Sequence, residues 1–113
     1  MTDKTAAQIL TEAADIIDRN GWIQGDYWDT DQEEHGTPEA ECRVCLYGAI
    51  NIAVHGSPNH PQADRRPDFL WDMTAAVERE AGPMHLDDWN DTAGRTQDEV
   101  TALLRTVAGK VDF

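Results

Sequence analysis

Four stretches of the chain place apolar residues three or four positions apart, which is the spacing of one buried face of an α-helix. The first stretch predicts a helix over residues 5–20. Thr5 and Gln8 have the spacing of a capping box, in which the two side chains bind backbone N–H groups of the first turn. Asn20 and Gly21 predict its end, because glycine readily adopts the left-handed conformation that follows a last helical turn.

The second stretch predicts a helix over residues 38–55, with Pro38 in its first turn. From Val44 to Val54 the sequence is apolar at almost every position, which is typical of a central helix buried on all sides. Gly48 interrupts this run, and its missing side chain would let a neighbouring helix approach closely.

Two further helices are expected over residues 67–81 and 97–108, the second with a capping box formed by Thr96 and Glu99. The remaining segments are expected to be long irregular loops, namely residues 22–36, 57–66 and 83–95. The sequence therefore predicts one compact all-α domain over residues 1–113, with about four helices and the second helix central and buried. Its core is expected to contain Leu46, Ile50, Ala53, Leu103 and Leu104.

The charge of the chain restricts its partners. It has 22 acidic and 9 basic residues, for a formal net charge of −13. Nucleic acids and anionic membranes attract clustered lysine and arginine, so neither is an expected partner, whereas a basic protein is. No apolar run approaches the ~20 residues that span a bilayer, and the first residues lack the pattern of a signal peptide, so we expect a cytoplasmic protein.

An acidic run over residues 26–34 contains two aromatic residues, Tyr27 and Trp28. Solvated carboxylates alone give no reason for aromatic rings at these positions. The sequence therefore predicts a binding patch that contains Tyr27, Trp28, Asp29 and Asp31, with charge to steer a basic partner and rings to bury on contact. The alternative is that both rings pack on the core and the carboxylates keep the protein in solution.

The chain offers two weak metal-binding patterns. Cys42 and Cys45 have zinc-ligand spacing, but no second such pair accompanies them. The segment from Asp88 has ligand residues of a calcium-binding loop at its first, third, fifth and twelfth positions, namely Asp88, Asn90, Thr92 and Glu99, but Ala93 stands where that loop needs glycine. We therefore expect no metal and no cofactor.

An alternative function is an enzyme that uses Cys45 as its nucleophile. Gln24, Cys45, His85 and Asn90 follow one another in the order that papain-type enzymes use for their oxyanion, nucleophile, base and orienting groups. Order alone does not define such a site, because the side chains must also meet in space. The residues around Cys45 match no signature of a cysteine protease.

Three short motifs carry a family resemblance. They are Gly21-Trp22 with Gln24-Gly25, Cys45 with Gly48-Ala49, and Trp89-Asn90-Asp91 with Gly94-Arg95-Thr96 and Glu99-Val100. Together they resemble an uncharacterised family of small proteins in actinobacteria and their phages. The resemblance covers most of the chain, implies a bacterial or phage origin, and supplies no activity, ligand or catalytic residue.

The last motif also has a physical interpretation. Trp89 would pack its loop against the core, while Asn90 or Asp91 would accept hydrogen bonds from backbone N–H groups. Arg95 would pair with Asp91 or Asp88, or donate to a helix carbonyl. Together with Trp22, Gln24 and Cys45, these residues form either a structural lock or a binding site, and the sequence favours the lock.

These observations lead to one leading hypothesis and two alternatives. The leading hypothesis is a small acidic, non-enzymatic protein-interaction factor, encoded by a phage and acting on a host protein. The alternatives are a cysteine-dependent enzyme that uses Cys45 and a protein that mimics the charge of DNA.

Overall fold

The computed structural model describes residues 4–59 and 69–113. In these two ranges the chain is helical, and its only β-type pairing is a pair of isolated bridges from Val44 to Trp22 and to Trp28. The helices are α1 (Ala6–Asn20), α2 (Thr30–Glu34), the 3-10 helix η1 (Glu39–Glu41), α3 (Leu46–His55), α4 (Leu70–Ala81), α5 (Leu86–Asn90) and α6 (Gln97–Ala108). The predicted all-α fold is confirmed.

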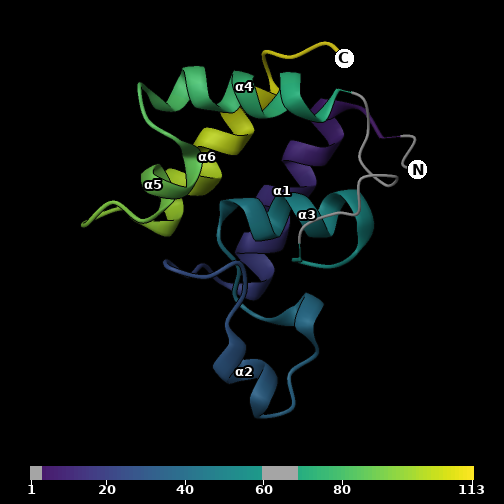
Figure 1. The fold of residues 1–113 in the computed structure, drawn as a ribbon. Helices are drawn as coiled ribbons and strands as arrows, with labels where there is room; N and C mark the ends of the chain where they lie inside the picture. Colours follow the sequence, from purple (N-terminus) through teal and green to yellow (C-terminus); the bar gives the residue numbers. More distant parts are fainter. Residues whose placement is uncertain (1–3, 60–68) are drawn as a thin grey trace.

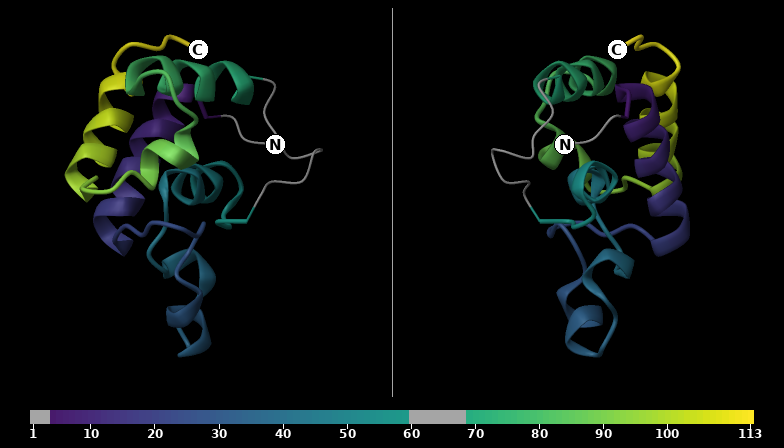
Figure 2. Two further views of the ribbon diagram at one scale, coloured as in Figure 1. Left: turned by 60° about the vertical axis from the view of Figure 1, so that its left-hand side comes forward. Right: turned by 90° about the vertical axis from the view of Figure 1, so that its right-hand side faces the viewer.

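Helix α1 packs against both α3 and α6 (Figure 1), and α1 and α6 lie together along one side of the molecule (Figure 2). Its capping box is formed by Thr5 and Gln8, as predicted, and Gly21 ends it with a φ of 98°. Helix α4 crosses the end of this arrangement and contacts α6 and the short helix α5. Helix α1 therefore contacts both α6 and α3.

Helix α3 is shorter than predicted, because it begins at Leu46 and not near residue 38. The backbone of Val44 is extended and bonded to the segment after α1: its N–H donates to Gly21 at 3.2 Å, and its carbonyl accepts from Ile23 at 3.1 Å. An apolar run fits a buried extended segment as well as a buried helix, and here the neighbouring backbone decides between them. The prediction of a helix over residues 38–45 was wrong, apart from the single turn of η1.

Two short helices occupy segments that were predicted to be irregular. In α2, Asp29 caps the first turn by accepting from the N–H groups of Asp31 and Gln32, and no residue of the helix is buried. In α5, Leu86, Trp89 and Asn90 are buried. Helices this short show little periodicity, so the apolar pattern did not reveal them.

The segment that carries α2 and η1 projects from the helical body (Figure 2). We call residues 29–42 the acidic lobe, because Asp31, Glu33, Glu34 and Glu41 lie exposed on it. The predicted loop over residues 57–66 and the predicted start of the third helix at residue 67 fall largely outside the described residues. No helix in the described ranges has both the length and the apolar character needed to cross a bilayer.

The core forms one cluster of buried residues from α1, α3, α4, α5 and α6. It contains all five residues predicted for it, namely Leu46, Ile50, Ala53, Leu103 and Leu104.

Replacing Leu104, whose side chain is fully buried, tests this core. We expect Leu104→Ala to lower the free energy of unfolding by about 2–5 kcal/mol, because it removes buried methyl groups and leaves a cavity. Chemical denaturation followed by circular dichroism measures the change. Thr106→Ala, an exposed position of the same helix, is the control and should change stability by no more than about 0.5 kcal/mol. Equal stability of the two variants would contradict the assigned core.

Candidate functional site

The side-chain amide of Asn90 lies at the meeting point of three segments. Its Oδ1 accepts hydrogen bonds from the indole Nε1 of Trp22 at 2.7 Å and from the backbone N–H of Leu46 at 3.0 Å. Its Nδ2 donates to the carbonyl of Ile23 at 3.3 Å. Asn90 is only 1% exposed, so these bonds satisfy polar groups that have little access to water. We call Trp22, Leu46 and Asn90 the Asn90 lock.

Residues next to the lock extend the same contact. The Nε2 of Gln24 donates to the carbonyls of Asn90 at 3.0 Å and Thr92 at 2.9 Å. The backbone N–H of Gly25 donates to the carboxylate of Asp91 at 2.9 Å. The segment that follows α1 is therefore fixed along the end of α5 by both side-chain and backbone groups.

Arg95 fixes the other side of the Trp89 loop. Its guanidinium carbon lies 3.9 Å from the centre of the Trp89 ring, and its Nε donates to the Trp89 carbonyl at 3.0 Å. Its Nη1 pairs with Glu99 at 3.1 Å. Of the alternatives expected from the sequence, the bond to a helix carbonyl is present, because Trp89 belongs to α5. The carboxylate that pairs with Arg95 is that of Glu99, where the sequence suggested Asp91 or Asp88.

Gly48 allows a loop, and not a helix as predicted, to approach α3. The backbone N–H of Cys45 donates to the carbonyl of Tyr27 at 3.2 Å. A β-carbon at position 48 would overlap that same carbonyl oxygen, so only glycine leaves room for it. The close approach places the Tyr27 ring edge-on to Tyr47, with 6.5 Å between ring centres and an interplanar angle of 65°.

A groove with a volume of about 350 Å³ lies beside these two rings. A second hollow of about 320 Å³ shares Tyr27, Tyr47 and Asp87 with it. We call the two together the aromatic groove. Its first part is lined by Tyr27, Tyr47, Leu70, Trp71, Asp87 and Asp88 among others, and its second part reaches Asp26, Cys45 and Asp91. The groove therefore combines aromatic rings from three separate segments with carboxylates.

Carboxylates make the electrostatic field in the groove negative. Burial, followed by the charges of Glu78 and Asp87, raises the pKa of Tyr47 to about 12. Burial raises the pKa of the Cys45 thiol to about 11, and the charge of Asp91 adds to the shift. Burial opposes an added charge of either sign, but the carboxylate charges that add to these two shifts favour a bound positive charge.

The structure separates the four residues of the predicted acidic-aromatic patch. Asp29 is 5% exposed and paired with Arg43, with 2.5 Å between its Oδ2 and the guanidinium Nη2. The hydrogen bond from Arg43, with those from the cap, lowers the pKa of Asp29. Trp28 is half-buried against the core and donates its Nε1 to Glu33 at 3.0 Å. Of the four, Tyr27 lines the aromatic groove, and Asp31 lies exposed on the acidic lobe.

Cys45 stands at the N-cap of α3, where its Sγ accepts from the N–H of Gly48 at 3.3 Å. It is 8% exposed, and its raised pKa keeps it a neutral thiol at pH 7, whereas a nucleophile needs the thiolate. Gln24 and Asn90, which the papain-type order invoked, are bonded within the Asn90 lock and its extension. The hydrogen bond from Gly48 gives Cys45 the role of capping α3.

The described residues contain no group of three or more histidine, cysteine, aspartate or glutamate side chains placed to hold a metal ion. Glu99, which the calcium-loop pattern would need as a ligand, instead accepts from the N–H of Thr96 at 2.9 Å in the capping box of α6.

The chain belongs to a family of unknown function, DUF6197, whose model matches residues 1–110. No curated protein and no solved structure matched the chain. The family membership agrees with the resemblance seen in the sequence and assigns no activity.

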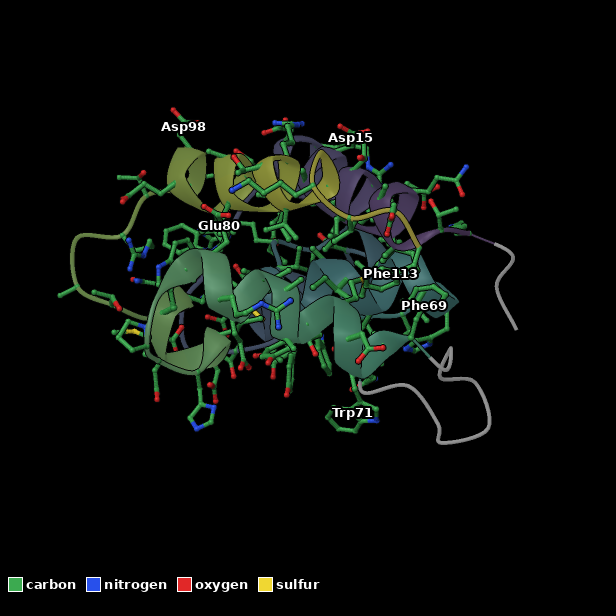
Figure 3. The ribbon with its side chains drawn as sticks, turned by 90° about the horizontal axis from the view of Figure 1, so that it is seen from above. Asp15, Phe69, Trp71, Glu80, Asp98 and Phe113 are labelled. Carbon is green, nitrogen blue, oxygen red and sulfur yellow. The ribbon has the colours of Figure 1, made fainter. Side chains whose placement is uncertain are left out.

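Sequence reasoning missed Tyr47, Trp71 and Asp87 as groove residues. They come from α3, α4 and α5, and no short motif contains them. One signal was present: Trp71 stands outside the apolar stripe of its helix, and it is 69% exposed. Figure 3 shows its side chain pointing away from the helical body.

We expect Asn90→Ala to lower the free energy of unfolding by about 2 kcal/mol, because it leaves the buried N–H of Leu46 and the partly buried indole N–H of Trp22 without an acceptor. Denaturation monitored by tryptophan fluorescence measures the loss. Ala93→Ser, an exposed change in the following loop, should have little effect. A loss below about 0.5 kcal/mol for Asn90→Ala would show that the lock contributes little.

Ionisation of Cys45 should make the protein less stable at alkaline pH. The thiol ionises near its ordinary value of 9.0 in the unfolded chain and near 11 in the folded one, so the folded state holds more protons between these values and stability falls as pH rises. We expect the decrease in unfolding free energy between pH 9 and 11 to be about 2 kcal/mol smaller in Cys45→Ala. Parallel pH curves for the two proteins would contradict the raised pKa.

Proposed function

We propose that the protein is a non-enzymatic interaction factor that binds a positively charged segment of another protein in the aromatic groove. The observation that carries this proposal is the combination, in one hollow, of the rings of Tyr27, Tyr47 and Trp71 with the carboxylates of Asp87 and Asp88. Aromatic side chains dominate the binding energy of protein interfaces, and complementary charges guide the partner to its site.

The charge of the whole molecule supports the same partner. A net charge of −13 attracts a basic protein over a distance of about 10 Å at an ionic strength of 0.1 M. The exposed carboxylates of the acidic lobe add to this attraction without contributing rings to the groove. The lobe therefore steers the encounter, and the groove holds the bound segment.

The bacterial or phage origin that the sequence resemblance implies indicates where such a partner would be found. In an actinobacterial cell or one infected by its phage, the partner would be a basic host protein and the complex would form in the cytoplasm. Capping by Cys45 and the bonded state of Gln24 and Asn90 leave the cysteine-dependent enzyme without supporting geometry.

A titration with a short basic peptide tests the proposal. We expect Asp87→Asn to weaken binding by about fivefold, because this carboxylate lines both parts of the groove. Asp98→Asn removes the same charge from α6, on the side of the molecule away from Trp71 (Figure 3), and should leave affinity almost unchanged. Calorimetry measures both affinities.

Salt provides the second part of the test. Raising the ionic strength from about 0.1 to about 1 M shortens the screening length from about 10 to about 3 Å, so binding by the wild-type protein should weaken. If Asp87→Asn and Asp98→Asn lower the affinity equally, then only the net charge of the protein matters. That result would contradict a site in the groove. No binding of the basic peptide to the wild-type protein would reject the proposed function.

A further inference from the structure

We propose that the aromatic groove selects arginine, and that an arginine side chain of the bound segment lies against Tyr47 with its guanidinium at the carboxylate of Asp87. This inference rests on the proposed function and adds the identity of the side chain that is recognised. It follows from the shape of the hollow, the nature of its walls and the position of its charges.

The size of the groove fits one long side chain. The first part, which Tyr47 and Asp87 line, has a volume of about 350 Å³, near the lower end of the roughly 300–1,000 Å³ found for small-ligand sites. Such a hollow accepts a single side chain or a small molecule, and it is too small for a whole helix of a partner, whose diameter with side chains is about 10–12 Å. The rest of a bound segment would therefore lie outside, next to the acidic surface.

The walls of the groove favour a planar cation with a long aliphatic stem. The rings of Tyr27, Tyr47 and Trp71 contribute the accessible apolar surface against which methylene groups can pack, because Ile50 and Leu70 are almost fully buried. Tyr47 and Tyr27 meet edge to face at 65°, so the pair presents ring surfaces in two directions. A guanidinium group stacks flat on an aromatic ring, whereas an ammonium group keeps its hydration more strongly and gains less from such walls.

The carboxylates that line the groove are placed to bind the guanidinium group at the end of the arginine side chain. Asp87 lines both parts of the groove, Asp88 lines the first part, and Asp91 lines the second. Arginine offers five donors in a fixed planar fork that can bond one carboxylate with two parallel bonds, and it keeps its charge at any physiological pH. Lysine offers a single point charge and no such fork. The charges of Glu78 and Asp87, which add to the effect of burial on the pKa of Tyr47, favour a cation at this position.

The Asn90 lock and Gly48 hold the groove in this shape. Gly48 admits the Tyr27 carbonyl and so places the Tyr27 ring beside Tyr47. Asn90 fixes the end of α5, the helix that carries Asp87 and Asp88, against the start of α3. Both walls are thus positioned before a partner arrives, which reduces the entropy lost on binding.

Two peptides that differ only in containing arginine or lysine provide the experiment. We expect the wild-type protein to bind the arginine peptide about tenfold more tightly, as measured by calorimetry. Tyr47→Leu should reduce this preference to about twofold or less, while Tyr47→Phe, which keeps the ring, should retain it. Asp98→Asn, on the opposite side of the molecule, is the control and should keep the full preference.

Equal affinities of the wild-type protein for the two peptides would overturn the inference and leave the proposed function standing. So would a preference for arginine that Tyr47→Leu does not change. Failure of both peptides to bind would reject the proposed function itself, and the inference with it. The comparison on the wild-type protein needs no variant, so it remains decisive even if Tyr47→Leu does not fold.

Discussion

The oxygen of one buried side-chain amide, Oδ1 of Asn90, accepts hydrogen bonds from the indole of Trp22 and from the backbone of Leu46. These groups belong to segments 68 and 44 residues away in the sequence, so a single acceptor ties the end of α1 and the start of α3 to α5. An acceptor in this position is costly to remove, because one buried and one partly buried donor would lose their partner. The arrangement of the loops around α3 depends on this contact.

The same contact determines the shape of the surface above it. The segment after α1 lies flat along α5 because Gln24 and Gly25 are bonded there, and it then turns so that the Tyr27 carbonyl approaches Gly48. Rings and carboxylates from separate parts of the chain therefore meet in one groove without any of them belonging to the lock. The residues of the sequence motifs support the groove, and Cys45, Asn90 and Asp91 among them also line its second part. Most of the residues proposed to bind the partner, such as Tyr47, Trp71 and Asp87, lie outside the motifs.

Helix periodicity and capping boxes predicted α1, α4 and α6, because long amphipathic helices carry their own signal. The extended backbone at Val44 could not be predicted in this way, since its hydrogen bonds come from Gly21 and Ile23 far along the chain. The motif residues Trp22, Gln24, Asn90 and Asp91 were identified from the sequence, and the structure brings them together. Tyr47, Trp71 and Asp87 were not identified, because only the packing of α3, α4 and α5 places them in one hollow. Asp29 was predicted to bind a partner because it lies in the acidic run beside two aromatic residues. In the structure it pairs with Arg43, which is 14 residues away in the sequence, and the sequence alone does not show that the two residues meet.

The central claim is that the aromatic groove, and not the acidic lobe, is the surface that binds a basic partner. Backbone and side-chain NMR shifts recorded during titration with an arginine-containing peptide test it most directly. The account predicts the largest, saturable shift changes at Tyr27, Tyr47 and Asp87, with small and salt-sensitive changes at Asp31 and the other exposed carboxylates of residues 29–42. Saturable changes confined to the acidic lobe, with the resonances of Tyr47 and Asp87 unmoved, would contradict it.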